Sequence, residues 1–197
     1  MSRLILVRHA EPTEHAHGRC YGSLDVGLAA AGREHAAQLA EELAAVPYDA
    51  VYASPRTRAR ETAGPLAAAR GLSVVVADDL REIDFGAFEG RTYEEIELSE
   101  PDIFAAWMTT PTAVRFPGGE SYGDLRVRAS RALDEIRAAH DAAVVVTHGG
   151  VIRAGVASWL ELPDHAIFRL DQSYCGVTVV DWVENAPIVR VLNGSLR

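Results

Sequence analysis

The chain has 197 residues and a formal net charge of −9, and 48% of its residues are hydrophobic. This length suits a single α/β domain. The acidic balance argues against nucleic acid or an anionic membrane as a partner, because the surface would repel both. All 19 cationic residues are arginine, which excludes a lysine-dependent phosphate-binding loop and a Schiff-base lysine.

The apolar runs and the cysteines of the sequence indicate in which cellular compartment the protein is expected. The run Leu4–Val7 is too short for a signal-peptide core, and no run reaches the roughly 20 apolar residues of a membrane helix. Cys20 and Cys175 stand far apart, without the paired spacing of a zinc site or a disulfide framework. We therefore expect a cytoplasmic protein with two free thiols and no membrane contact.

Short apolar, β-branched runs alternate with helical stretches along the chain. The expected strands are residues 4–7, 50–52, 74–76, 144–146, 177–180 and 188–192. The expected helices, rich in Ala, Leu, Glu and Arg, are residues 29–46, 56–70, 122–140 and 149–161. This alternation predicts a three-layer α/β/α fold with a mainly parallel central sheet. The last two strands are joined through residues 184–187 and are expected to form a hairpin, which puts an antiparallel edge strand on the sheet.

One segment breaks the alternation of strands and helices. Residues 92–118 contain Trp107, Met108, Phe116 and three prolines. We expect them to form a cap-like insertion at one end of the sheet, within a single domain that spans residues 1–197. Trp107 and Phe116 have two open interpretations, as an apolar wall of a binding site or as core packing.

Polar side chains follow four of the expected strands. The first strand ends in Arg8 and His9, and the second leads into a helix with Arg58 in its first turn. The third leads to Glu82, and the fourth ends beside His148. Because the carboxyl ends of parallel strands meet at the edge where ligands bind, these five side chains are expected to lie together.

These five residue types suit phosphoryl transfer through a covalent histidine. A neutral His9 imidazole is a good nucleophile for phosphorus once the charge of the phosphate is offset. Arg8 and Arg58 can each hold phosphate oxygens through a planar guanidinium, and a protonated His148 would add a third donor. Glu82 could protonate the leaving oxygen and then activate the attacking water.

The segments that carry these residues occur in a familiar order. VRHAEP, SPRTRARETA, LREIDFGAFEG, PGGES and VVTHGG follow one another between residues 3 and 153. Together they resemble the histidine phosphatase family, also called the phosphoglycerate mutase-like family. The resemblance implies a phosphoglycerate mutase-like fold, with His9 as nucleophile, Glu82 as proton donor, and a phosphate pocket formed by Arg8, Arg58 and His148. It also implies hydrolysis of a small phosphorylated substrate with no metal and no cofactor.

Further substrate contacts are implied by the same resemblance. The family commonly has a phosphate-contacting asparagine where His15 stands, and a glutamine-glycine pair where Tyr21 and Gly22 stand. Gly149 lies next to His148 at the expected start of a helix, where backbone N–H groups favour anions. His15, Tyr21, Gly22 and Gly149 are therefore candidate substrate-binding residues.

The resemblance leaves the activity open in part. The stretch GRCYGSLDV, residues 18–26, is similar to the α-ribazole phosphatase branch, which makes α-ribazole 5′-phosphate a candidate substrate. A phosphoglycerate mutase-type phosphotransferase is an alternative, although such mutases are generally longer and use lysine. A non-catalytic phosphate- or phosphoprotein-binding relative is another, but His9, Glu82 and His148 are all present. The sequence does not give the oligomeric state, and a homodimer is kept as an option.

A competing motif is Gly119-Glu120-Ser121-Tyr122-Gly123, which satisfies the GxSxG pattern of serine hydrolases. That motif must follow a buried strand, and residues 115–118 do not have the character of one. Ser121, with Asp124 three residues later, is more typical of a helix cap. We therefore expect Ser121 to be structural and not a nucleophile.

Two smaller features also favour structural interpretations. Ser54 and Pro55 are expected to begin the following helix, with the serine as N-cap and the proline at the first helical position. His15 and His17 lie in a polar loop near His9, and such a pair is more often exposed to solvent than bound to a metal. No metal site is expected.

Overall fold

The computed structural model describes residues 2–195 and contains one six-stranded sheet. The spatial order is β3-β2-β4-β1-β5-β6. The strands are β1 (Ser2–Arg8), β2 (Ala50–Ala53), β3 (Val74–Val76), β4 (Ala142–Thr147), β5 (Val177–Val183) and β6 (Ala186–Gly194). β1 to β4 run parallel, whereas β5 is antiparallel to both β1 and β6. The expected fold class is confirmed.

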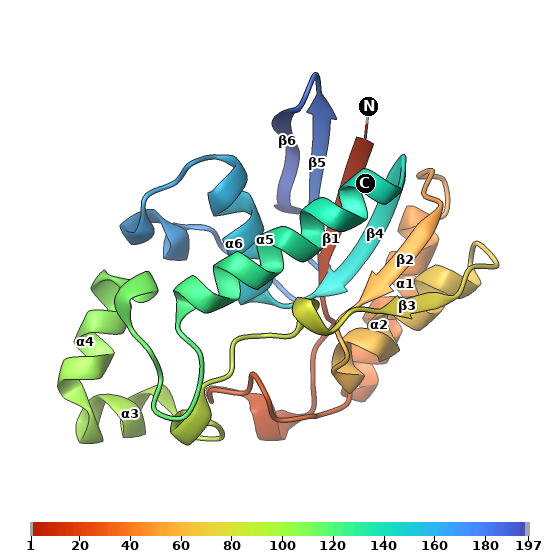
Figure 1. Cartoon of the computed structure of the whole chain (residues 1–197). Helices are drawn as coiled ribbons and strands as arrows, with labels where there is room; N and C mark the ends of the chain where they lie inside the picture. The colour runs from red at the N-terminus through yellow and green to blue at the C-terminus, as the bar shows by residue number, and fades with distance from the viewer. Residues whose placement is uncertain (1, 196–197) are drawn as a thin grey trace.

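Helices cover both faces of the sheet (Figure 1). They are α1 (Ala30–Leu43), α2 (Thr57–Ala68), α3 (Tyr93–Ser99), α4 (Pro101–Thr109), α5 (Tyr122–Ala139) and α6 (Gly149–Trp159). Side chains of β1 alternate between the layers, as the two-residue period of a strand requires. Leu4 and Leu6 pack with α5 and α6, whereas Ile5 and Val7 pack with α1 and α2. This two-sided burial explains why the strand is apolar without interruption.

The expected hairpin at the edge of the sheet is shorter than the sequence suggested. Val183 already pairs with Ala186, so the turn consists of Glu184 and Asn185 alone. Both turn residues have positive φ, at 51° and 70°, as the favoured two-residue hairpin turns require. Pro187 lies in the edge strand β6, where a missing N–H is tolerated.

Residues 92–118 form α3, α4 and a short turn at one end of the sheet (Figure 1). Phe116 is buried in the same hydrophobic cluster as α5 and α6, and its ring centroid lies 5.0 Å from that of Trp107. Of the two interpretations left open, core packing therefore holds for both aromatic residues. Trp107 also faces the cavity described below, whereas Phe116 does not line it.

The two predicted caps have different outcomes. Ser121 is the N-cap of α5 and forms a complete capping box with Asp124, as expected. Ser54 is not a cap, because α2 begins at Thr57 and its N-cap position is Arg56. The backbone N–H of Thr57 instead donates to Asp25, at 2.7 Å, so a carboxylate from a distant loop supplies the cap. The sequence next to the helix carries no sign of this distant partner.

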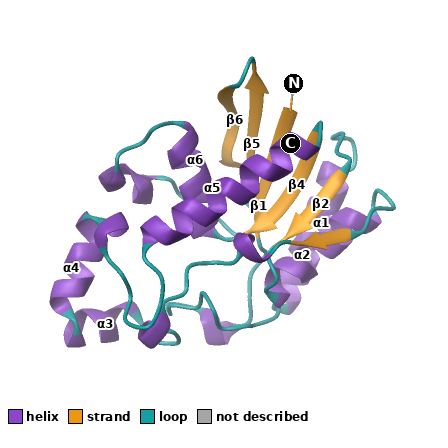
Figure 2. Ribbon diagram, viewed as in Figure 1, coloured by secondary structure: helices purple, strands orange, loops and turns teal. Residues whose placement is uncertain are grey.

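Within residues 2–195, no helix is long and apolar enough to cross a membrane. Loops gather at the carboxyl ends of the parallel strands, between the sheet and helices α3 and α4 (Figure 2). This is the end at which the polar residues that follow β1 and β4 are placed.

Candidate active site

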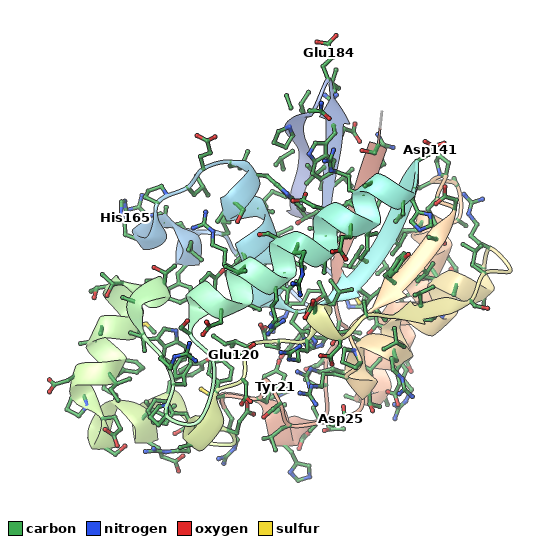
Figure 3. The ribbon with its side chains drawn as sticks, viewed as in Figure 1. Tyr21, Asp25, Glu120, Asp141, His165 and Glu184 are labelled. Atoms are coloured by element: carbon green, nitrogen blue, oxygen red, sulfur yellow. The ribbon has the colours of Figure 1, made fainter. Side chains whose placement is uncertain are left out.

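A cavity of about 150 Å³ opens at the carboxyl ends of β1 and β4. Figure 3 labels Tyr21 at this end of the sheet, while Asp141 and Glu184 mark the opposite end. The cavity is lined by Arg8, His9, Arg19, Tyr21, Arg58, Glu82, Ile83, Phe85, Tyr93, Trp107, Tyr122, His148, Gly149, Gly150, Arg153 and Phe168. All five residues that follow the predicted strands therefore meet in one place.

His9 directly follows β1 and is buried, with 2% of its surface exposed. Its backbone N–H donates to the carbonyl of Thr147, at 2.9 Å, which ties it to the neighbouring strand β4. The ring Nδ1 lies 2.8 Å from the carbonyl oxygen of Ala10. Because a carbonyl only accepts, Nδ1 carries the proton and Nε2 keeps its lone pair.

His148 faces His9, and their ring centroids are 5.1 Å apart. Its Nε2 lies 2.7 Å from the hydroxyl oxygen of Ser54, at the end of β2. Its Nδ1 is buried and makes no hydrogen bond with any described residue. This nitrogen is available to an oxygen of a bound anion.

The environment keeps both histidines neutral. Burial is the main reason that the pKa of His9 lies well below its usual 6.5, and the charges of Arg58 and Arg8 lower it further. The pKa of His148 is also lowered, first by burial and then by Arg58. A neutral His9 is the form that can attack phosphorus. Protonation of His148, on which its role as a third donor depends, needs the negative charge of a bound phosphate.

Arg58 is completely buried, lies over the ring of Tyr21, and hydrogen-bonds to backbone carbonyls. It donates to the carbonyls of Leu24, Tyr21 and Gly22, at 2.8, 2.9 and 3.1 Å. Its burial lowers the pKa of the guanidinium, which records how little solvent offsets the charge. A buried cation whose hydrogen bonds with the described residues go to neutral carbonyls is suited to bind an anion.

Arg8 is held by residues from an early loop and from the segment that precedes β5. It donates to the carbonyl of Gln172, and its carbon Cζ lies 4.2 Å from the ring centroid of Tyr174. Its other terminal nitrogen lies 3.4 Å from the hydroxyl of Tyr21, which in turn is 3.1 Å from the hydroxyl of Tyr174. These contacts fix the guanidinium beside His9 without adding a carboxylate to neutralise it.

Glu82 is the sole carboxylate among the described residues that line the cavity. Its Oε2 accepts a hydrogen bond from the backbone N–H of Gly150, and Oε1 accepts one from Ile83, each at 3.0 Å. A Cβ added at Gly150 would lie 2.2 Å from Oε1 of Glu82, so a larger residue there would displace this carboxylate. The two hydrogen bonds hold Glu82 in the cavity that the two histidines also line.

Four arginines and one carboxylate line this cavity, in a chain whose net charge is −9. The local excess of positive charge is opposite to that of the whole molecule. Such a site attracts an anion of several charges, as a phosphate monoester is.

The predicted substrate contacts divide into two groups. Tyr21 and Gly149 line the cavity. Gly22 does not line it, but its backbone carbonyl accepts a hydrogen bond from Arg58, which does. His15 does not reach the cavity; it is exposed on the short helix η1 (Glu14–Ala16). Ala16 is the buried residue of that turn, which directs the adjacent His15 outward.

A single carboxylate organises the loop that carries Gly22. Glu89 accepts hydrogen bonds from the backbone N–H groups of Gly22, Ser23 and Phe85, at 3.1, 2.8 and 3.0 Å. These bonds fix the loop whose carbonyls hold Arg58. Glu89 therefore shapes the cavity without lining it.

Sequence reasoning missed several residues of the site. Ser54 could have been found, because it stands at the end of β2, on the same edge as His148. Arg153 lies four residues after Gly149, so helical spacing alone places both on one face. Tyr174 had no local signal, because its place beside His9 depends on β5 pairing antiparallel with β1.

No group of three or more His, Cys, Asp or Glu side chains in the described part of the chain is arranged to hold a metal ion. The pair His15 and His17 lies on a separate open depression together with Arg19. The chemistry available in the cavity is that of imidazole, guanidinium and carboxyl groups.

The chain matches the model of the histidine phosphatase superfamily (branch 1) over residues 4–195. Phosphoserine phosphatase 1 of Hydrogenobacter thermophilus is 34% identical over 195 residues, which cover 98% of this chain and 92% of that protein. The solved α-ribazole phosphatase of Shigella flexneri has a TM-score of 0.87 at 25% identity, covering 98% of this chain and 96% of that one. The mycobacterial glucosyl-3-phosphoglycerate phosphatase has a TM-score of 0.89 at 29% identity, covering 98% and 99%. The names of these three proteins give three different substrates.

Proposed function

The chain belongs to the histidine phosphatase superfamily and is a phosphatase, and we propose that it hydrolyses a small phosphorylated metabolite through a phosphohistidine at His9, without a metal ion. Arg8, Arg58 and His148 form the phosphate pocket in this proposal, with Gly149 beside it. Glu82 is the proton donor. The proposal rests on a buried His9 whose pKa is lowered and whose Nδ1 is held by the Ala10 carbonyl, and which lines the cavity together with Arg8 and Arg58.

The first step forms the phosphohistidine. Nε2 of His9 attacks phosphorus, and the bond from phosphorus to the ester oxygen breaks. Arg8, Arg58 and His148 hold the non-bridging oxygens, where charge is offset by positioned donors. Glu82 gives its proton to the ester oxygen, so that the product leaves as a neutral alcohol.

The second step regenerates the enzyme. Glu82, now a carboxylate, takes a proton from water, and the water oxygen attacks phosphorus. The bond from phosphorus to Nε2 breaks, inorganic phosphate leaves, and His9 returns to its neutral form. The same carboxyl group thus serves as acid and then as base, as microscopic reversibility allows.

For the substrate we propose a class, small phosphorylated metabolites, with two candidate members. α-Ribazole 5′-phosphate is a candidate from the sequence and from the name of the Shigella flexneri structure. O-Phosphoserine is a second candidate, from the name of the Hydrogenobacter thermophilus relative. A non-catalytic role is not favoured, because the proposed nucleophile, acid and phosphate pocket lie together. A phosphoglycerate mutase-type phosphotransferase is the alternative, since it would use the same residues and a 30% identical relative is named a probable phosphoglycerate mutase.

We also propose that the chain folds as a single domain. Residues 92–118 contribute Trp107 and Phe116 to the same hydrophobic cluster as β1, β4, α5 and α6. A segment that shares its core with the sheet is expected to fold with it.

The proposal predicts hydrolysis of p-nitrophenyl phosphate by the wild-type protein in EDTA. His9→Ala should lower kcat by at least about 10³-fold, because it removes the atom that forms the covalent bond. Circular dichroism would verify that the variant is folded. His35→Ala, at an exposed position on α1, is the control and should retain wild-type turnover. Activity retained in folded His9→Ala, or lost from wild type in EDTA, would contradict the proposal.

A further inference from the structure

Arg153 lines the cavity but has no task in the reaction described above. It is half-buried on α6, one turn after Gly149. Its Nε donates to the carbonyl of Leu170, at 2.8 Å, which fixes the guanidinium plane. A Cβ added at Gly149 would lie 3.1 Å from its terminal Nη1, so the guanidinium lies against the first turn of α6, beside His148.

The charge of Arg153 is not neutralised by the described part of the protein. Within residues 2–195, no described carboxylate pairs with Arg153, and its two terminal nitrogens make no hydrogen bond with described residues. The phosphate group of the substrate is already matched by Arg8 and Arg58. A further cation in the same cavity is suited to a second anionic group.

Arg153 lies on the side of the cavity where the leaving alcohol must be. Glu82, the proposed proton donor to that alcohol, accepts a hydrogen bond from Gly150, and Nη1 of Arg153 lies 3.1 Å from where a Cβ on the adjacent Gly149 would be. The two side chains therefore flank the same turn of α6. Tyr93 lines the cavity close to Glu82 and Arg153. Burial raises the pKa of Tyr93 to about 12; the charge of Glu82 also raises this pKa, and the charge of Arg153 lowers it.

The enclosed volume of the cavity favours a small leaving alcohol. Its volume of about 150 Å³ is below the roughly 300–1,000 Å³ that is usual for drug-sized ligands. A small alcohol fits this volume better than a nucleoside does. Its anionic group must then lie only a few bonds from the ester oxygen, within reach of Arg153.

We propose that Arg153 determines specificity by binding a carboxylate on the leaving alcohol, so that the substrates are small phosphate monoesters of hydroxy acids. This inference rests on the proposed phosphatase function and narrows its substrate class. The guanidinium presents its two terminal nitrogens to the carboxylate in the fork geometry that suits two oxygens. Phosphate monoesters without a carboxylate leave this cation unpaired and are the poorer substrates.

Matched pairs of esters test the proposal, because the carboxylate of one member is replaced in the other by hydrogen or by a hydroxymethyl group. The pairs are O-phospho-L-serine with O-phosphoethanolamine, and 3-phosphoglycerate with glycerol 3-phosphate. Wild type should favour the carboxylate-bearing member of each pair in kcat/KM. Arg153→Met should reduce this preference by about tenfold to a hundredfold, the range for a lost hydrogen-bonded charge pair. Arg153→Lys should restore part of it.

Arg137→Met is the matched control, since Arg137 is half-buried at the opposite end of the sheet and lines a different depression. It should leave the preference within each pair as in wild type. An equal loss on both members of a pair in Arg153→Met would show a structural role and overturn the proposal. A wild-type preference for α-ribazole 5′-phosphate or for the carboxylate-free esters would overturn it as well.

A binding experiment separates this inference from the proposed function. Calorimetric titration of His9→Ala with O-phospho-L-serine and O-phosphoethanolamine needs no turnover. The first ligand should bind about tenfold or more tightly than the second, and His9→Ala/Arg153→Met should bind both alike. If wild type hydrolyses no ester, the phosphatase function fails, while this comparison still decides the role of Arg153. Equal binding of the two ligands by His9→Ala would overturn the carboxylate site.

Discussion

The two histidines of the cavity are both buried, and burial favours their neutral forms. In the proposed mechanism His9 needs no general base, because burial and two neighbouring arginines already favour its neutral form. The Ala10 carbonyl then fixes which nitrogen carries the proton. The pKa of His148 is lowered for the same reasons, and its buried Nδ1 makes no hydrogen bond with any described residue. A bound phosphate changes this balance, because its charge favours protonated imidazole.

The lowered pKa values predict how stability depends on pH. Both histidines have a pKa below 6.5 in the folded protein, so at acid pH the unfolded chain binds more protons and is favoured. The free energy of unfolding should be steady above about pH 7 and fall below pH 6.5, by up to about 1.4 kcal/mol per pH unit for each histidine. Urea unfolding at pH 7.5 and 5.5 measures this loss.

Substitutions show whether the buried histidines cause the loss of stability at acid pH. His148→Gln should reduce the pH dependence between pH 7.5 and 5.5, and His35→Gln, at an exposed position, is the control. The lowered pKa values of Glu120 and Asp181 act below this window, since they belong to carboxyl groups whose usual values are 4.5 and 3.8. A stability that does not change between the two pH values would contradict neutral, buried histidines.

At the scale of elements, one connection supports two arginines of the site. The segment between η5 (Asp164–Arg169) and β5 gives the carbonyl of Leu170 to Arg153 and the carbonyl of Gln172 to Arg8. It then places Tyr174 against the guanidinium of Arg8. Because β5 runs antiparallel to β1, the start of β5 lies at the carboxyl end of β1. The reversed strand therefore completes a site that parallel strands alone would leave open.

The N-terminus of α5 gives a prediction at the same scale. Ser121 accepts a hydrogen bond from the backbone N–H of Asp124, at 3.1 Å, and the Asp124 carboxylate accepts one from the N–H of Ser121, at 2.8 Å. Ser121→Ala should lower the free energy of unfolding by about 1 kcal/mol without loss of phosphatase activity. Urea unfolding and p-nitrophenyl phosphate turnover measure the two effects.

Ser121→Asp is the control, because aspartate is also a favoured N-cap residue and should restore most of the stability. A Ser121→Ala variant that keeps its stability but loses activity would show that the GxSxG motif is catalytic. We expect a less stable but active variant instead, since residues 115–118 before the motif form no strand element.

At the scale of the whole molecule, the sequence predicted the architecture because its signals are local. The strands are short β-branched runs, which are largely buried in the central strands β1 and β4, and the runs alternate with long helical stretches. The parallel topology then implies that His9, Arg58, Glu82 and His148 share one edge, and the cavity contains all four. Position in the sheet, together with the family resemblance, was sufficient for these residues.

The remainder of the site was not predictable from local patterns. Tyr174 reaches His9 through the reversed strand β5, and Asp25 caps α2 from another loop. His15 was predicted to contact substrate from its place in the motif, but the turn of η1 exposes it. Ser54 was assigned to a helix cap, because proline follows it, and instead contacts His148. Each of these outcomes depends on tertiary contacts that neighbouring residues do not encode.

Trapping a phosphohistidine would show whether the phosphoryl group passes through His9, as we propose. Wild type and Glu82→Gln, in which loss of the base should slow the second step, would be quenched in alkali during turnover of p-nitrophenyl phosphate, because phosphohistidine survives alkali and not acid. Tandem mass spectrometry would locate the modified residue. We expect a phosphoryl group on His9 of both proteins, with more of it in Glu82→Gln. A phosphoryl group on another residue, or none in either protein while phosphate is still released, would contradict it.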